Sequence, residues 1–158
     1  MSKQPLIGWA PVSMDIRADR RRCSMRAPMP YVKRELPLPT FTTTSSPTRA
    51  RPATRAALIY QLSGDLKPLL IDTVAARAVG FDRPIMHGLG VYGAVAVAAC
   101  RAVGVSATSM QRLRCRFAGI VRQGETLDLR IWRIADSHAF TASCGERPVL
   151  DFALLETA

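Results

Sequence analysis

The feature that most constrains the fold is an apolar run of thirteen residues, Gly88–Cys100, which Arg101 interrupts. The run is rich in alanine and Gly104 follows it, so we expect a helix from about Gly88 to Val103. Roughly 20 residues are needed to cross a bilayer, so this helix is too short to do so. Because it is apolar nearly all round, other parts of the protein must enclose it.

Strand signals follow this helix in quick succession. Gln111–Ile120 and Thr126–Ile134 alternate apolar and polar side chains, which is typical of half-buried strands. Ala139–Cys144 and Val149–Leu155 are two further candidates, separated by a turn over Gly145–Pro148. One buried helix followed by four antiparallel strands predicts an α+β domain whose sheet wraps around a long central helix.

Two short elements are expected before the central helix. Ala56–Leu62 is apolar and predicts either a helix turn or a short buried strand, which Ser63-Gly64-Asp65 ends. A second short helix is expected over Thr73–Val79, with Asp72 as its N-cap and Gly80 as its C-cap.

The first 50 residues have a different composition. They hold nine Lys or Arg against three Asp or Glu, a net charge of +6 out of +10 for the whole chain. Arg20–Arg22, the repeated prolines and Thr42–Thr48 predict loop or linker, with one irregular edge strand over Glu35–Thr44. We therefore divide the chain into a basic, irregular N-terminal segment, residues 1–50, and one domain, residues 51–158.

The basic charge suits nucleic acid, an anionic membrane or a phosphate-rich ligand such as coenzyme A. Nucleic acid is disfavoured because no binding motif is present and aromatic residues make up only 6% of the chain. The cysteines form no CxxC pair and no metal-like spacing with a histidine, so we expect reduced thiols and no metal site. The Arg- and Ser/Thr-rich start has some features of a transit peptide, but its prolines favour a soluble cytoplasmic protein instead.

Two segments carry a family resemblance: Leu62–Asp72 (LSGDLKPLLID) and Gly80–Leu89 (GFDRPIMHGL). Together they resemble the hydratase segment of MaoC-like dehydratases, the R-specific enoyl-CoA hydratase family, with the pattern SGDxNPLHxD and then GFxxPIxHGL. Arg116–Gly119 (RFAG) and Gly124–Leu127 (GETL) are similar to a later strand and turn of that family. The resemblance covers about two thirds of the chain and implies a hot-dog fold.

The resemblance also implies a chemistry. Adding water to an enoyl thioester needs a base for the water, a proton for Cα and donors for the enolate oxygen. In the family an Asp and a His hold the water, an Asn orients them, and a Gly offers its backbone N–H to the thioester carbonyl. By position, Asp65 is the acid and Gly88 is the oxyanion donor. Lys67 stands at the Asn position and Leu70 at the His position, so we expect weakened activity.

Several of these residues admit two interpretations. His87 is either a structural hydrogen-bonding residue at the start of the central helix or a substitute catalytic base. Asp65 is either catalytic or the first residue of an Asx turn. Lys67 either pairs with Asp65 or lies in solvent. His138, at a strand start, is expected at the surface.

The resemblance gives a set of predicted substrate-binding residues: Lys67, Leu70, Arg83 and Leu89. Arg83 either meets coenzyme A phosphates or pairs with Asp82 in a turn. On the first long strand every second residue is an arginine, and this face is either solvated or phosphate-binding. Its members are Arg112, Arg114 and Arg116.

Two functions follow as expectations. The first is a hydratase or dehydratase acting on enoyl- or 3-hydroxyacyl-CoA thioesters, with no cofactor besides the coenzyme A of its substrate. The second is an inactive acyl-thioester-binding or partner subunit. In either case we expect a homodimer or a heterodimer with another hot-dog subunit, and no nucleic-acid or membrane partner. A thioesterase is disfavoured because no Asp or Glu lies between Asp82 and Glu125.

Overall fold

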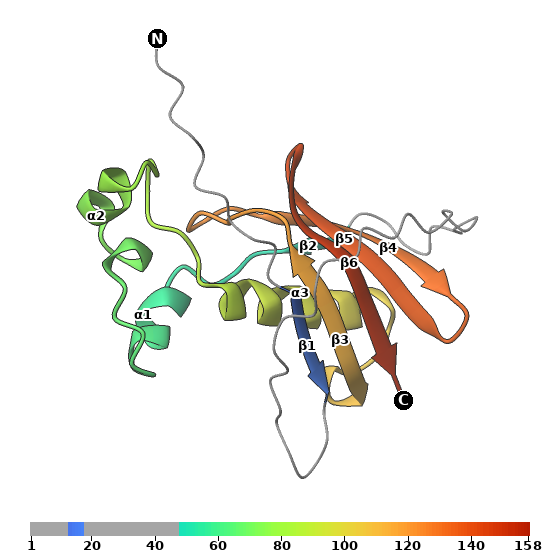
Figure 1. Cartoon of the computed structure of the whole chain (residues 1–158). Coiled ribbons are helices and arrows are strands. Elements are labelled where there is room, and N and C mark those ends of the chain that lie inside the picture. Colours follow the sequence, from blue (N-terminus) through green and yellow to red (C-terminus); the bar gives the residue numbers. More distant parts are fainter. Residues whose placement is uncertain (1–12, 18–47) are drawn as a thin grey trace.

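A computed structural model describes residues 13–17 and 48–158 (Figure 1). The helical elements are α1 (Ala56–Gln61), α2 (Thr73–Ala78), α3 (Gly88–Ala102) and the 3₁₀ turns η1 (Pro68–Leu70) and η2 (Ala107–Ser109). The strands are β1 (Ser13–Arg17), β2 (Thr48–Ala50), β3 (Met110–Phe117), β4 (Leu127–Ile134), β5 (Ser137–Cys144) and β6 (Arg147–Thr157).

The six strands form one sheet in the order β1-β3-β6-β5-β4-β2, in which every neighbouring pair is antiparallel. The sheet curves around α3 (Figure 1), which confirms the predicted α+β hot-dog arrangement. Its two edge strands, β1 and β2, both come from the first 50 residues of the chain. They are short, five and three residues, as edge strands of natural sheets commonly are.

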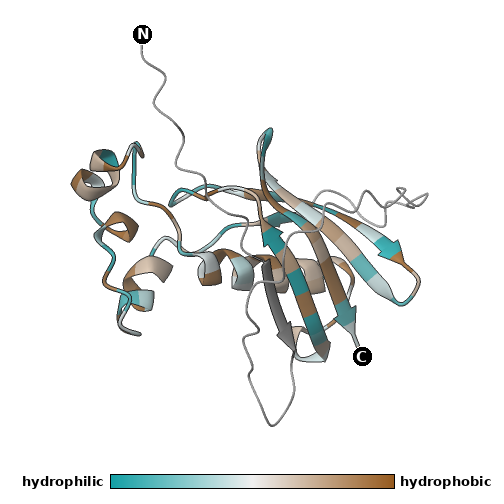
Figure 2. Cartoon of the chain, viewed as in Figure 1, coloured by the Kyte–Doolittle hydropathy of each residue, from teal (hydrophilic) through white to brown (hydrophobic). Residues whose placement is uncertain are grey.

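The core lies between α3 and the concave face of the sheet. Strand side chains such as Leu113, Ile131 and Phe140 are no more than 2% exposed, and they pack around Val95 and Ala99 of the helix. Figure 2 shows this apolar colouring along α3 and in bands across the strands. The small alanine side chains of α3 let the sheet approach the helix closely, as its composition predicted.

The element boundaries differ from the predictions by a few residues. Ala56–Gln61 is a helix, not a strand, and β6 begins already at Arg147, so the turn before it is shorter than predicted. Asp72 caps α2 by accepting a hydrogen bond from the Val74 N–H at 2.8 Å, as expected. The predicted strand over Glu35–Thr44 lies outside the described residues.

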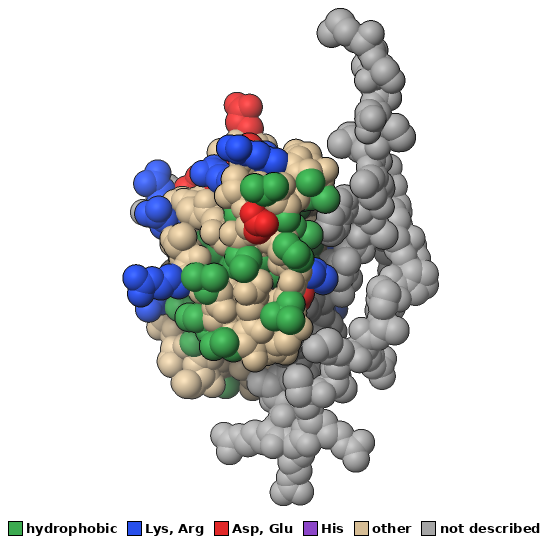
Figure 3. Space-filling view, turned by 90° about the vertical axis from the view of Figure 1, so that its left-hand side faces the viewer, with side chains coloured by type: hydrophobic (Ala, Val, Ile, Leu, Met, Phe, Trp, Pro, Cys, Tyr) green, Lys and Arg blue, Asp and Glu red, His purple; other side chains and the backbone are tan. Residues whose placement is uncertain are grey.

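α1, η1 and α2 form a lobe beside the N-terminal end of α3 (Figure 1). We call residues 56–79 the α1–α2 lobe. Its inner side has a small apolar cluster of Ala57, Leu70 and Ile85, against which Tyr60 and Phe81 pack. Its outer side shows many exposed apolar side chains (Figure 3). They are Leu58, Ile59, Leu62, Leu66, Ile71, Val74 and Val79.

Candidate active site

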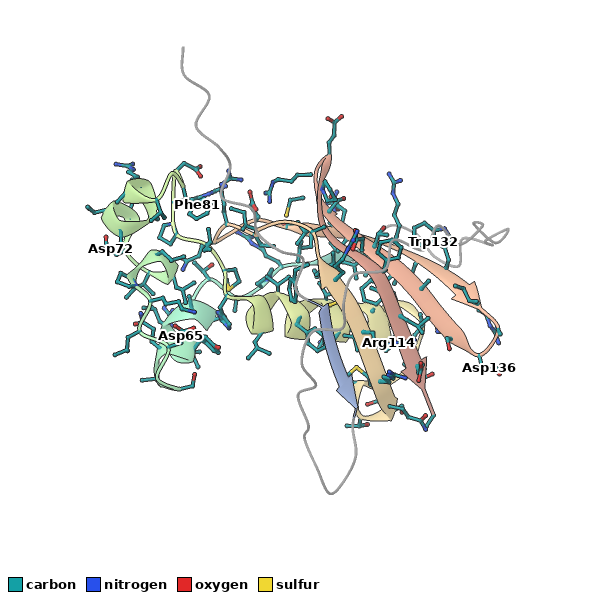
Figure 4. The ribbon with its side chains drawn as sticks, in the orientation of Figure 1. Asp65, Asp72, Phe81, Arg114, Trp132 and Asp136 are labelled. Carbon is teal, nitrogen blue, oxygen red and sulfur yellow. The ribbon has the colours of Figure 1, made fainter. Side chains whose placement is uncertain are left out.

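The loop after α1 brings Asp65 and Lys67 together. Asp65 Oδ1 accepts a hydrogen bond from the Lys67 N–H at 3.4 Å, which is an Asx turn. The Lys67 Nζ lies 3.6 Å from Asp65 Oδ2, while the lysine side chain stays 69% exposed. The turn and the ion pair therefore coexist, and Asp65 lies in the α1–α2 lobe, away from Arg114 on the sheet (Figure 4).

Leu70 closes the inner side of the lobe. It is 4% exposed and belongs to the apolar cluster with Ala57 and Ile85. Its carbonyl accepts a hydrogen bond from Gln123 Nε2 at 2.5 Å, which joins η1 to the loop between β3 and β4. The leucine side chain carries no atom that can donate, accept or transfer a proton.

His87 occupies the N-cap position of α3, but its side chain makes no capping hydrogen bond. Its ring is stacked on the ring of Tyr60, with centroids 3.9 Å apart and 7° between the planes. Nδ1 is buried and has no hydrogen-bond partner among the residues that the structure describes. An aromatic contact holds the ring, and the His87 carbonyl accepts the first backbone hydrogen bonds of α3, from the N–H groups of Gly90 and Val91. Whether the side chain is structural or catalytic stays a prediction.

The environment of His87 favours a neutral imidazole. Burial lowers its pKa below the ordinary value of 6.5, and the negative charge of Asp65 partly opposes this shift. At neutral pH the imidazole is uncharged and able to accept a proton.

Gly88 and Leu89 begin α3 next to His87. A Cβ on Gly88 would lie 3.6 Å from the ring of Phe117, in ordinary van der Waals contact with strand β3. The first backbone N–H groups of a helix have no partner within the helix, and they lie at its positive end. Leu89 is 39% exposed beside them. The start of α3 can therefore donate to a carbonyl oxygen.

A groove of about 460 Å³ runs along α3 from this end. Gly90, Gly93, Ala94 and Val97 of the helix line one side, and the segment that continues from β2 lines the other. Arg101 lies at the far end of the helical side. The groove is therefore lined by small and apolar residues together with arginines.

Arg83 points toward a different cluster. Its guanidinium lies 3.9 Å from Asp82 and 3.7 Å from Glu125. The turn salt bridge that was one of its two interpretations is therefore present, and it extends to Glu125. Arg83 remains half-exposed, with 49% of its side chain accessible.

Glu125 is the centre of that cluster and was not predicted. It accepts hydrogen bonds from Arg147 Nη2 at 2.7 Å and from the Arg122 N–H at 2.8 Å. Arg122 also donates to Asp82 at 2.6 Å. Burial would raise the pKa of Glu125, but the bonds and charges of Arg122 and Arg147 lower it below its ordinary value.

These contacts place the segment that leads into α3. The Met86 N–H donates to the Val121 carbonyl at 2.7 Å, and the Gln123 N–H donates to the Pro84 carbonyl at 3.0 Å. Together with the ion pairs of Glu125 they fix the backbone just before His87. The sequence could have pointed to Glu125, because it lies in the GETL motif and is the first acid after Asp82. No sequence signal identified Tyr60 or Gln123 as contacts.

The remaining predicted residues lie elsewhere. The arginines of β3 are on the face of the sheet turned away from α3, where Arg112 and Arg114 approach Glu156 and Arg116 pairs with Asp151. These arginine side chains contact acids and also stay 19%, 44% and 24% exposed, in the order Arg112, Arg114 and Arg116. His138 is half-buried, in contrast to the expected surface position, and burial together with Arg133 lowers its pKa.

Other classes of site find little support in the described part of the chain. Within residues 13–17 and 48–158 no group of three His, Cys, Asp or Glu could hold a metal ion. Cys100, Cys115 and Cys144 are free thiols. None of the helices in these ranges is long and apolar enough to cross a membrane.

The sequence is similar to those of two mycobacterial enzymes. An enoyl-CoA hydratase of Mycobacterium tuberculosis is 45% identical over 78 residues, which are 49% of this chain and 27% of the relative. A 3-hydroxyacyl-thioester dehydratase of the same organism is 41% identical over 85 residues, 52% of this chain and 29% of that protein. The chain thus spans between a quarter and a third of the length of these relatives.

Solved structures share this fold. A MaoC-like dehydratase from Phytophthora capsici superposes with a TM-score of 0.64 and 28% identity, over 79% of this chain and 46% of the other. An (R)-hydratase from A. caviae, 17% identical with a TM-score of 0.57, shares the fold over 73% of this chain and 96% of its own. The model of the "MaoC like domain" family matches residues 33–151. Since that match covers most of the chain, this protein belongs to the MaoC-like domain family.

Proposed function

We propose that this domain binds enoyl- and 3-hydroxyacyl-CoA thioesters and catalyses their hydration or dehydration at a reduced rate. The observation that carries the proposal is the placement of Asp65, His87 and Gly88. The charge of a carboxylate in the α1–α2 lobe acts on a neutral imidazole, and that imidazole directly precedes the backbone N–H groups of Gly88 and Leu89 at the start of α3.

Each group has a role in this chemistry. His87 or Asp65 accepts a proton from water while the oxygen of that water bonds to Cβ of the enoyl thioester. The Gly88 N–H stabilises the negative charge that develops on the thioester oxygen. The proton is then returned to Cα, which gives the 3-hydroxyacyl thioester. Dehydration is the reverse sequence.

Leu70 is the reason for proposing a reduced rate. It stands where the resemblance places the motif histidine, and its buried apolar side chain cannot share the proton transfer with Asp65. Loss of a general base typically lowers a rate by about 10²- to 10⁴-fold. Lys67 pairs with Asp65, so the carboxylate stays positioned although the histidine is missing.

The test is hydration of crotonyl-CoA, followed by the loss of enoyl-thioester absorbance. We expect slow turnover by the wild type, abolished in Asp65→Asn and strongly lowered in His87→Gln. Asp136→Asn, in the exposed turn between β4 and β5, is the matched control for the change of charge. Equal turnover in Asp65→Asn and Asp136→Asn would contradict the proposed site.

A second function is favoured by the outer surface of the α1–α2 lobe. Leu62, Leu66 and Val74 are 88%, 71% and 75% exposed there, an apolar surface that commonly marks an interface. The similar P. capsici structure contains a further length of chain about equal to its matched part. The alternative proposal is a partner subunit that holds acyl thioesters and pairs with another hot-dog domain.

Two measurements separate these functions. Calorimetric binding of crotonyl-CoA without any turnover would favour the partner subunit over the enzyme. Light scattering at micromolar concentration should show a dimer in either case, and a Leu62→Ser/Leu66→Ser double variant should weaken it. A wild-type protein that is monomeric under these conditions would contradict the proposed pairing.

A further inference from the structure

We propose that Tyr60 and Gly90 together clamp the His87 ring in one orientation and act as positioning residues for it. The clamp consists of Tyr60, Gly90 and the His87 ring that lies between them. Its consequence for catalysis rests on the proposed function, in which His87 exchanges a proton with water or substrate.

Tyr60 provides the first side of the clamp. Its ring lies nearly parallel to the imidazole, with 3.9 Å between the two centroids, so the two rings are stacked. Tyr60 is in α1 and His87 is at the start of α3, so the contact also fixes the α1–α2 lobe against the central helix. A tyrosine from the lobe thus covers one face of the ring.

Gly90 provides the second side. A Cβ at this position would lie 2.8 Å from both Cε1 and Nε2 of His87, and 3.2 Å from Met86 Sδ. Real Cβ atoms do not approach other atoms so closely, so any larger residue forces the ring to move. Gly93, one turn further along the same helix, has no such neighbour. The glycine is therefore required by the ring and not by the helix.

The clamp decides which ring nitrogen can react. Nδ1 is buried without a hydrogen-bond partner in the described part of the chain, whereas Nε2 is on the ring edge that faces Gly90. Gly90 also lines the groove along α3. Asp65 is the charged group that acts on the ring. Nε2, which lies next to the groove-lining Gly90, is therefore the nitrogen assigned to proton exchange.

The test is an NMR titration of the two histidine side chains, assigned with His138→Gln. In the wild type the His87 Cε1–H resonance should be shifted by the Tyr60 ring current and should titrate below the ordinary histidine range. Tyr60→Leu should abolish the ring-current shift and move the titration midpoint upward, while Tyr60→Phe should restore both. An unchanged His87 resonance in Tyr60→Leu would overturn the clamp.

The matched pair Gly90→Ala and Gly93→Ala tests the second side. Both add one methyl group to the same helix, but only Gly90→Ala should displace the His87 resonance. If both variants leave it in place, Gly90 has no positioning role. This readout needs no turnover, so it separates failure of the clamp from failure of the proposed enzyme.

The catalytic consequence is measured with crotonyl-CoA. Misplacing a reacting group by about 1 Å can cost on the order of 100-fold in rate. We expect Tyr60→Leu and Gly90→Ala to lower kcat by about 10- to 100-fold with little change in KM, and the pH profile of Tyr60→Leu to shift with its NMR midpoint. A lowered kcat without any shift of the pH profile would assign Tyr60 a merely structural role.

Discussion

The side-chain amide of Gln123 donates a hydrogen bond to the carbonyl oxygen of Leu70 at 2.5 Å, across 53 positions of sequence. The bond ties the motif segment of the α1–α2 lobe to the loop between β3 and β4. It also means that the backbone at Leu70 is held independently of its side chain. The orientation of residue 70 is therefore fixed by the fold, whichever side chain stands there.

Leu70→His should raise hydratase activity by about 10²- to 10⁴-fold, because it returns a proton-transferring group five residues after Asp65. Stability should fall by about 1–3 kcal/mol, since a polar ring replaces a side chain that is 4% exposed. Crotonyl-CoA hydration and urea denaturation measure the two effects. Leu70→Gln is the control, because it is polar but cannot exchange a proton; an equal gain there would refute the assignment.

Gln123→Leu should lower the free energy of unfolding by about 1–3 kcal/mol, because it leaves the Leu70 carbonyl without its partner. Gln111→Leu removes the same amide from an exposed position on β3 and should change stability little. Urea denaturation of the two variants makes the comparison. If they lose the same stability, the bond to Leu70 contributes nothing of its own.

Glu125→Gln should reduce the dependence of stability on pH in the acid range. The arginines hold the pKa of Glu125 below its ordinary value of 4.5 in the folded state, although burial opposes this. Its contribution is therefore present above about pH 4.5 and is lost as the pH falls through the folded pKa.

At neutral pH the same variant should lose about 1.5–3 kcal/mol, since its hydrogen bonds to charged groups are weakened. Denaturation curves at pH 7 and at pH 3–4 provide the measurement. Glu146→Gln, in the exposed turn between β5 and β6, should leave the acid dependence as it is in the wild type. A parallel loss of acid dependence in both variants would argue against a special role for Glu125.

Ala135→Gly should stabilise the protein by about 1 kcal/mol. Ala135 has φ +48° in the hairpin turn between β4 and β5, a conformation that costs a residue with a Cβ roughly 1–2 kcal/mol. The gain is smaller than that cost, because glycine loses more chain entropy on folding. Asp136→Gly, at the neighbouring turn position without a positive φ, should give no gain, and thermal unfolding distinguishes the two.

The sequence alone determined the elements whose signal is local. The apolar run from Gly88 required an enclosed helix, and alternating side chains on β3 and β4 gave strands with one buried face. Asp72 was identified as a cap because its bond spans only two residues. Periodicity and capping act over a few neighbouring positions, so they are visible in the order of the residues.

Tertiary structure decided the contacts that build the candidate site. The stack of Tyr60 on His87 joins residues 27 positions apart, and Glu125 meets Arg147 across 22. No short-range pattern encodes these pairings, because they exist only once the α1–α2 lobe and the sheet are placed around α3. The same holds for the sheet edges: β1 reaches β3 across about a hundred residues, and only closure of the whole sheet brings the two strands together.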